Sequence, residues 1–175
     1  MAQNATSIQP DRATGRIVDS PLSEDIHCRV RWAYDYWNAK RGARPWPLRE
    51  DIDPVDFPRD ALPTVYILER LESEDDYLVR LGGNVYRQIY GRETTGLRVS
   101  QMIPREGDGA AIHDEFATAL STGRPVLHIG RLGWHKQGAH LSFQRILLPV
   151  SSAGPRCDIL VGVAVLFGLD GAVRY

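Results

Sequence analysis

Histidine and cysteine are the residues whose spacing could build a metal centre in this chain. His128, His135 and His140 form its one histidine cluster, and His135 and His140 fall near an expected turn, where side chains are usually solvated. A zinc site needs several ligands at compatible spacing. Cys28 and Cys157 are far apart and outside any C-x-x-C pair, which argues against a thiolate zinc site or a disulfide scaffold. We therefore predict no metal site.

Motifs for covalent and phosphoryl chemistry are missing as well. The sequence contains no G-x-S-x-G and no H-E-x-x-H motif. Gly82 and Gly83 precede Asn84 and an expected helix, as in a phosphate-binding loop, but no G-K-[ST] follows, so a tight turn with a helix cap is the simpler interpretation. We predict that the protein is not an enzyme.

Composition indicates one soluble domain. Of 175 residues, 43% are hydrophobic and 25% are charged, which is near the globular average. The net charge of −1 produces no positive field that would attract nucleic acid or an acidic membrane. No apolar run approaches the roughly 18 residues of a membrane span, and the N-terminus lacks a signal-peptide pattern. We expect a cytoplasmic protein that binds neither nucleic acid nor membrane.

The N-terminal third is expected to hold a tail, a helix and a connector. Residues 1–22 are polar and aperiodic, which predicts a disordered tail. Residues 23–44 predict a helix from about 24 to 41, with Ser23 as N-cap and Gly42 as the stop. Its apolar stripe, at helical spacing, is Ile26, Val30, Ala33 and Trp37. Five prolines in residues 45–63 predict an extended connector.

The remainder predicts an α+β domain over residues 64–169, followed by a tail at 170–175. The expected elements are strands at 64–69 and 77–82, short helices at 85–90 and 97–103, a helix from Asp108 to about 122, and strands at 125–134, 139–150 and 157–167. Both faces of the last strand are apolar, which places it centrally in the sheet. The result is a five-stranded antiparallel sheet with helices between strands two and three, its outer face covered by the N-terminal helix.

This order of elements resembles the PAS fold, and the sequence resembles the small bacterial proteins of the PAS_5 family. The residues that carry the resemblance, between about Val30 and Phe167, are Tyr36-Trp37, Arg41-Gly42 and Pro45, Asp51-Ile52-Asp53-Pro54, the segment from Arg80-Leu81-Gly82-Gly83 to Gly91-Arg92-Glu93-Thr94-Thr95-Gly96, Thr122-Gly123-Arg124-Pro125, and Gln144-Arg145-Ile146-Leu147-Leu148-Pro149. The resemblance implies a sensory or protein-interaction module and provides no catalytic residues.

The resemblance also bears on cofactors. PAS domains that bind haem take an axial histidine from the longer helix or its surroundings, where His113 lies, but an exposed helical histidine is the simpler interpretation. A flavin adduct would require a cysteine among the short helices, and none occurs between Cys28 and Cys157. We predict neither haem nor flavin, and the cofactor is otherwise unknown.

Three functions stay open for a stand-alone module without its own output domain. In the first, a small ligand binds between the sheet and the helices, where the candidate lining residues are Tyr86, Tyr90, Phe116, His128, Phe143 and Arg145. In the second, a filled core makes the protein an adaptor for an unidentified signalling protein. The third is a cone-shaped α+β isomerase or dehydratase, but no spacing indicates the Asp or His base facing a Tyr that it needs.

Arg145 is the most informative candidate, because its guanidinium lies between Phe143 and Leu147 on one strand face. A charge there must reach a carboxylate, an anionic ligand or water. An acid such as Glu69 or Asp158 is the simplest partner.

Aromatic residues around the N-terminal helix predict a homodimer. Trp32 lies off the apolar stripe and adds aromatic area that a monomer would expose. The predicted interface residues are Ile26, Val30, Ala33, Tyr34, Tyr36 and Trp37. The alternative is that the tyrosines pack on the proline-rich connector.

Overall fold

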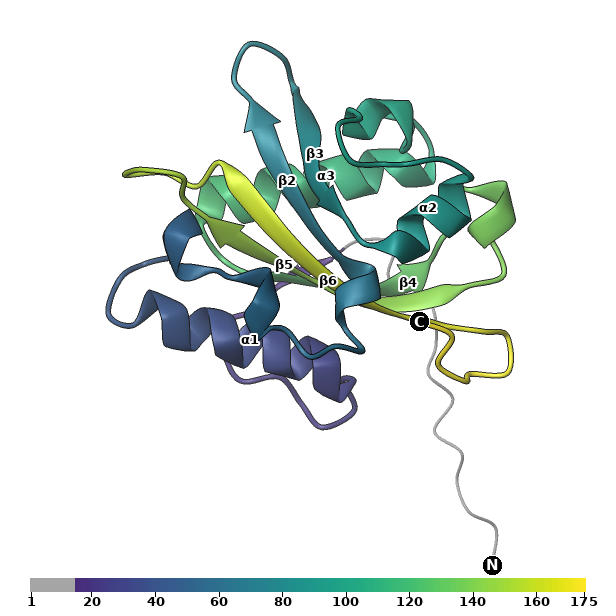
Figure 1. The fold of residues 1–175 in the computed structure, drawn as a ribbon, viewed down its shortest axis with the longest axis horizontal. Coiled ribbons are helices and arrows are strands. Elements are labelled where there is room, and N and C mark those ends of the chain that lie inside the picture. The colour runs from purple at the N-terminus through teal and green to yellow at the C-terminus, as the bar shows by residue number, and fades with distance from the viewer. Residues whose placement is uncertain (1–14) are drawn as a thin grey trace, which may run out of the picture.

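A computed structural model describes residues 15–175, whose centre is one antiparallel sheet of six strands (Figure 1). The strand order is β1-β4-β5-β6-β2-β3. The strands are β1 (Arg16–Ile17), β2 (Val65–Leu71), β3 (Asp76–Gly82), β4 (Val126–Arg131), β5 (Ser142–Val150) and β6 (Ile159–Phe167). The helices are α1 (Cys28–Arg41), α2 (Asn84–Tyr90) and α3 (Asp108–Thr122). The predicted α+β class is confirmed.

The sixth strand, β1, lies in the segment predicted to be a disordered tail. Arg16 and Ile17 pair with Leu127 and Val126 of β4, and the backbone N–H of Val18 donates to the carbonyl of Pro125 at 2.8 Å. Val18 is buried in the core. Two residues are too few to show the alternation by which a strand is read from sequence. The rest of the predicted tail, residues 1–14, lies outside the described residues.

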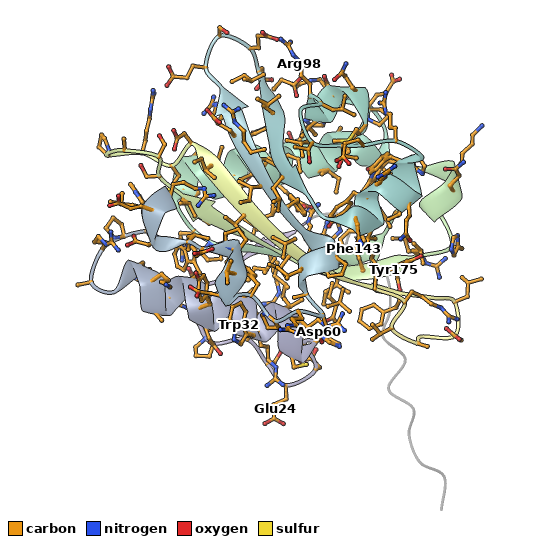
Figure 2. All side chains as sticks on the ribbon, viewed as in Figure 1. Glu24, Trp32, Asp60, Arg98, Phe143 and Tyr175 are labelled. Carbon is orange, nitrogen blue, oxygen red and sulfur yellow. The ribbon has the colours of Figure 1, made fainter. Side chains whose placement is uncertain are left out.

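Helix α1 begins four residues later than predicted. Residues 24–26 form a turn, closed by a hydrogen bond from the N–H of Ile26 to the carbonyl of Ser23. The N-cap is His27, whose Nδ1 accepts from the backbone N–H of Arg29 at 3.2 Å, so Ser23 is not the cap. Glu24 points away from the body of the protein (Figure 2). The predicted stop at Gly42 is confirmed.

The sheet has two apolar faces, and different helices cover them (Figure 1). On the outer face, Val30, Ala33 and Trp37 of α1 pack against β5 and β6, and Trp37 Nε1 donates to the carbonyl of Pro149 at 2.8 Å. On the inner face, α3 packs over β4, β5 and β6, and α2 lies on this same face of the sheet. Strand β6 is buried on both sides, as its composition predicts.

The last residues return along β6. The chain turns at Gly171, whose φ of +74° favours glycine, and Phe167 then bridges to Val173. The N–H of Leu166 donates to the carbonyl of Tyr175 at 3.0 Å, and the N–H of Arg174 donates to the carbonyl of Leu166 at 2.8 Å. These bonds occupy the part of β6 that β2 does not reach, so residues 172–175 are held against the edge of β6.

Candidate functional site

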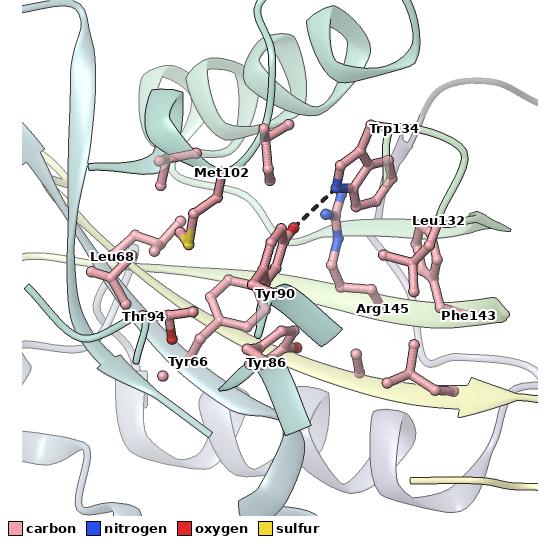
Figure 3. Close-up of a pocket in the computed structure, with 16 residues that line it drawn as sticks. Tyr66, Leu68, Tyr86, Tyr90, Thr94, Met102, Leu132, Trp134, Phe143 and Arg145 are labelled. Carbon is pink, nitrogen blue, oxygen red and sulfur yellow. Dashed lines mark hydrogen bonds between the residues drawn. The ribbon is translucent and has the colours of Figure 1, made fainter. Parts of the chain in front are cut away.

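A cavity lies between the inner face of the sheet and the segment that includes α2 and residues 94–103 (Figure 3). Its volume is about 80 Å³. Its walls are mainly aromatic and aliphatic, and its lining residues are Tyr66, Leu68, Val79, Gly82, Tyr86, Tyr90, Thr94, Val99, Met102, Ile103, Leu132, Trp134, Phe143, Arg145, Ala164 and Leu166. Arg145 is the one charged side chain among them.

Three tyrosines form one side of the cavity. Tyr66 of β2 and Tyr86 of α2 meet edge to face, with ring centroids 5.5 Å apart. The hydroxyl of Tyr86 donates to the carbonyl of Thr64 at 2.9 Å, and that of Tyr90 accepts from Trp134 Nε1 at 3.0 Å. Burial raises the pKa of Tyr66 to about 12 and also raises the pKa of Tyr86 and Tyr90. The three phenols therefore stay protonated at neutral pH.

Three buried polar atoms of the lining have no hydrogen-bond partner among residues 15–175. They are Tyr66 Oη, Thr94 Oγ1 and Arg145 Nε. The three side chains belong to residues that are 8%, 2% and 5% exposed, respectively. Leaving a buried polar group unpaired costs about 1–3 kcal/mol. Three such atoms around one cavity are therefore a costly arrangement unless something else satisfies them.

Two glycines make room for two of these side chains. Gly162 of β6 lies opposite Tyr66, and a Cβ at position 162 would overlap the Tyr66 ring. A Cβ on Gly82 of β3 would overlap Thr94 Oγ1 in the same way. Glycine in a strand interior commonly marks such a close approach. Both polar groups therefore reach the cavity wall because β6 and β3 lack a side chain at these positions.

Behind the cavity, Arg145 belongs to a buried ionic network centred on Glu115 of α3. One Arg145 nitrogen, Nη2, donates to Glu115 Oε2. His128, opposite Arg145 on β4, has its Nδ1 2.9 Å from Glu115 Oε1, and the backbone N–H of Gly15 donates to the same oxygen at 2.5 Å. The side chains of Arg145 and Glu115 are 6% and 4% exposed. The network therefore joins α3, two strands and the residue before β1.

This network sets the charge states of its members. Desolvation disfavours the Glu115 carboxylate, but the hydrogen bond from His128 and the charge of Arg145 outweigh it, so the pKa of Glu115 is lowered. Desolvation likewise disfavours the charged guanidinium, but neighbouring Tyr66 and Glu115 outweigh it and raise the pKa of Arg145. Arg145 and Glu115 are thus a charged pair whose charges cancel.

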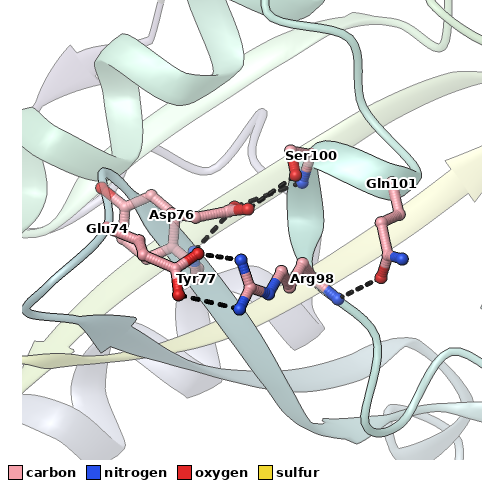
Figure 4. A network of polar contacts seen from close by, with 6 residues as sticks. All are labelled: Glu74, Asp76, Tyr77, Arg98, Ser100 and Gln101. Atoms are coloured by element: carbon pink, nitrogen blue, oxygen red, sulfur yellow. Dashed lines mark hydrogen bonds and ion pairs between the residues drawn. The ribbon is translucent and has the colours of Figure 1, made fainter.

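Polar contacts fix the segment that covers the cavity (Figure 4). Asp76, buried at the start of β3, accepts from the hydroxyl of Ser100 at 2.6 Å and from its N–H at 3.2 Å. Both terminal nitrogens of Arg98 donate to Glu74 in the β2–β3 loop. These bonds hold the short 3-10 turn Val99–Gln101 on the β2–β3 hairpin, and Val99, Met102 and Ile103 then close the cavity.

The sequence profile of the PAS_5 family, described as a PAS domain, matches residues 26–165. This match covers most of both layers of the fold, every cavity-lining residue except Leu166, and the side chains of the ionic network. The chain belongs to the PAS_5 family. No curated protein matches it. Within residues 15–175, no helix is long and apolar enough to cross a membrane, and no three His, Cys, Asp or Glu side chains gather as metal ligands.

The PAS cavity includes four of the six predicted ligand residues: Tyr86, Tyr90, Phe143 and Arg145. Phe116 and His128 lie outside it. Phe116 is fully buried in the core, and its ring lies 5.7 Å from the Arg145 guanidinium carbon. The side chain of His128 is held by Glu115 instead.

The predicted partners of Arg145 are wrong. Glu69 pairs with Arg80 near the surface, and Asp158 accepts from Ser152. The actual partner, Glu115, follows Ile112 by three residues and precedes Phe116, so it lies on the buried stripe of α3. A glutamate on the buried stripe of a helix indicates that a cationic side chain lies opposite it, so the sequence did contain a sign of this pair.

Sequence reasoning also missed several lining residues, of which Tyr66 and Thr94 carry unpartnered atoms. Tyr66 alternates with Leu68 on the inner face of a predicted strand, so its orientation could have been read from the pattern. Thr94 lies in a loop between α2 and the Val99–Gln101 turn, where no periodicity reveals which side chains turn inward.

The predicted interface residues are mostly buried within the chain of this PAS domain. Ile26, Val30, Ala33, Tyr34 and Trp37 belong to the outer-face core. Tyr36 is half-buried, with its ring 5.2 Å from the ring of Phe57 in the connector, and its hydroxyl donates to Asp56 at 2.9 Å. Trp32 also packs on Phe57, at 5.3 Å. A single chain therefore covers most of the aromatic area from which a dimer was predicted.

Proposed function

We propose that this PAS domain senses a small molecule bound in the inner-face cavity and passes the signal on through contacts with another protein. PAS domains are in general sensory or signalling modules and commonly work through protein contacts. The observation that carries the proposal is the set of three unpartnered polar atoms, from Tyr66, Thr94 and Arg145, in the wall of one apolar cavity. Ligand sites are typically apolar with a few convergent polar groups.

Two features favour this function over the alternatives. A filled-core adaptor needs no cavity, whereas about 80 Å³ is open here. An isomerase or dehydratase needs a general base in contact with its substrate. None of the cavity-lining residues in the described chain is Asp, Glu or His, so no conventional base faces the three tyrosines.

Native mass spectrometry of the full chain, purified without denaturation from its own host, tests the proposal. We expect a bound small molecule whose mass is lost when the cavity is filled by Ala164→Ile, because Ala164 lines the cavity on β6. The control is Ala33→Ser on α1, a buried position on the opposite face of the sheet, which should leave the bound mass in place. A chain that retains its fold and carries no small molecule in any preparation would contradict ligand sensing.

A further inference from the structure

The cavity holds an excess of hydrogen-bond donors. Arg145 Nε carries a proton and can only donate, and the hydroxyls of Tyr66 and Thr94 can each donate one proton. Because burial raises the pKa of Tyr66 to about 12, its hydroxyl keeps that proton at neutral pH. Tyr90 adds a fourth hydroxyl, which already accepts from Trp134 and so has its own proton left to donate. Because Arg145 Nε can only donate, a ligand that satisfies it must accept a hydrogen bond, and the hydroxyls can donate to the same acceptor class.

The charge balance of the cavity disfavours an ionic ligand. The positive charge of Arg145 is already matched by Glu115, which also receives His128 and the Gly15 N–H. An anion would have to displace this carboxylate or lie buried without a counter-charge, and either outcome costs several kcal/mol. A cation would find no acidic side chain among the lining residues.

Size limits the ligand further. A drug-sized molecule occupies a pocket of about 300–1,000 Å³, whereas this cavity measures about 80 Å³. The space exceeds the roughly 10–15 Å³ that a single water requires. A molecule of a few carbon atoms with one polar end matches both the volume and the mainly apolar walls.

We propose that the ligand is a small uncharged carbonyl compound, whose oxygen accepts from the Tyr66 hydroxyl and Arg145 Nε while its carbon skeleton contacts Leu68 and Met102 (Figure 3). This inference rests on the proposed function and specifies the class of molecule that the cavity selects. Tyr66 and the Arg145 guanidinium are neighbours in the cavity wall, so one acceptor oxygen can complete both unpaired atoms. The hydrocarbon part then faces the apolar walls. The unpaired donors therefore favour a ketone over a hydrocarbon of the same size, and the charge balance favours it over a carboxylate.

Met102 provides a direct reporter of cavity occupation. It is one of two methionines in the chain, the other being Met1, so ¹³C-methyl labelling yields two methionine signals, and Met102→Leu identifies one of them. The probes are cyclopentanone, methylenecyclopentane, which has a carbon in place of the oxygen, and cyclopentanecarboxylate. We expect cyclopentanone to shift the Met102 methyl signal saturably and to bind at least tenfold more tightly than either of the other two.

One substitution removes the Tyr66 donor while keeping the shape of the side chain. Tyr66→Phe should weaken cyclopentanone binding about three- to tenfold, the equivalent of one lost hydrogen bond. The matched control is Tyr34→Phe, a buried tyrosine on the opposite face of the sheet, which should leave the affinity unchanged. Thermal melting of each variant verifies that the fold is intact.

The outcomes separate this inference from the proposed function. Binding of methylenecyclopentane as tight as that of the ketone, with no effect of Tyr66→Phe, would overturn the carbonyl assignment and leave an apolar ligand site. Tighter binding of the carboxylate would overturn it in favour of an anion. If no probe shifts Met102 while native mass spectrometry still finds a bound molecule, the carbonyl class fails and ligand sensing stands.

Discussion

Replacing Glu115 by alanine should destabilise the fold more than any surface ion-pair substitution. The change leaves the Arg145 guanidinium, whose side chain is 6% exposed, without its carboxylate, and it removes the acceptor for His128 and for the Gly15 N–H. Removing one partner of a buried pair typically costs about 3–5 kcal/mol. A whole domain has only about 5–15 kcal/mol of stability. We therefore expect Glu115→Ala to be marginally folded, and Glu115→Gln, which keeps the size and an acceptor oxygen, to be intermediate.

A double substitution separates the loss of an interaction from the burial of an uncompensated charge. In Glu115→Leu with Arg145→Met, no unpaired charge is left, and apolar replacement of a buried pair is often neutral or stabilising. Gly15 and His128 still lose their acceptor, at about 1–3 kcal/mol. We expect the double variant to be less destabilised than Glu115→Ala, although it removes one more charged side chain.

Urea unfolding followed by circular dichroism measures these differences. With a slope of about 2 kcal/mol per molar urea, a loss of 3–5 kcal/mol lowers the midpoint by about 1.5–2.5 M. The control is Glu72→Ala, which breaks an ion pair with Arg156 whose side chains are 73% and 74% exposed, and should not move the midpoint measurably. A Glu115→Ala midpoint equal to that of the control would refute the buried network as a stabilising element.

Four further predictions follow from particular contacts. The pKa of Glu115 is lowered from its ordinary 4.5, so its ionised form stabilises the fold above pH 4.5, and this stabilisation is lost as the pH falls through the lowered pKa. The difference in free energy of unfolding between wild type and Glu115→Gln should therefore narrow in acid. A difference that stays constant with pH would contradict this. Burial raises the pKa of the Cys157 thiol to about 12, so iodoacetamide at pH 8 should modify exposed Cys28 alone in the folded chain and both cysteines in urea, as counted by mass spectrometry. Gly162→Ala should cost about 1–3 kcal/mol of folding stability by forcing an overlap in the cavity wall, whereas Gly154→Ala, where a Cβ meets nothing within 4 Å, should be neutral in the same urea-unfolding assay. Light scattering of the full chain tests the predicted homodimer, and a monomer would refute it.

The fold was predictable where the sequence has long periodic segments. The two apolar faces of β6 place it at the centre of the sheet, and the stripe of Val30, Ala33 and Trp37 places α1 on the outer face, as the structure confirms. Prediction failed at β1, because two paired residues contain no period, and at the start of α1, where His27 rather than Ser23 supplies the cap.

The candidate site was predictable only in part, because contacts between distant segments decide it. The apolar surroundings of Arg145 show that it needs a partner, but the partner, Glu115, lies 30 residues away and is selected by how α3 packs on the sheet. Thr94 reaches the cavity because Gly82 has no side chain to block it, which is a coincidence of three-dimensional packing that neither local pattern reveals.

The Arg145 guanidinium belongs both to the cavity wall and to the ionic network. This double role limits which substitutions can test ligand binding. Its Nε is unpaired in the cavity wall, while its Nη2 holds Glu115, and Glu115 in turn holds the residue before β1. Any substitution of Arg145 therefore changes ligand contacts and stability together. The hydroxyl of Tyr66 has no hydrogen-bond partner within the described chain, so its removal costs the folded protein no hydrogen bond. A loss of binding in Tyr66→Phe consequently reports on the ligand, whereas the same loss in an Arg145 variant would not distinguish recognition from folding.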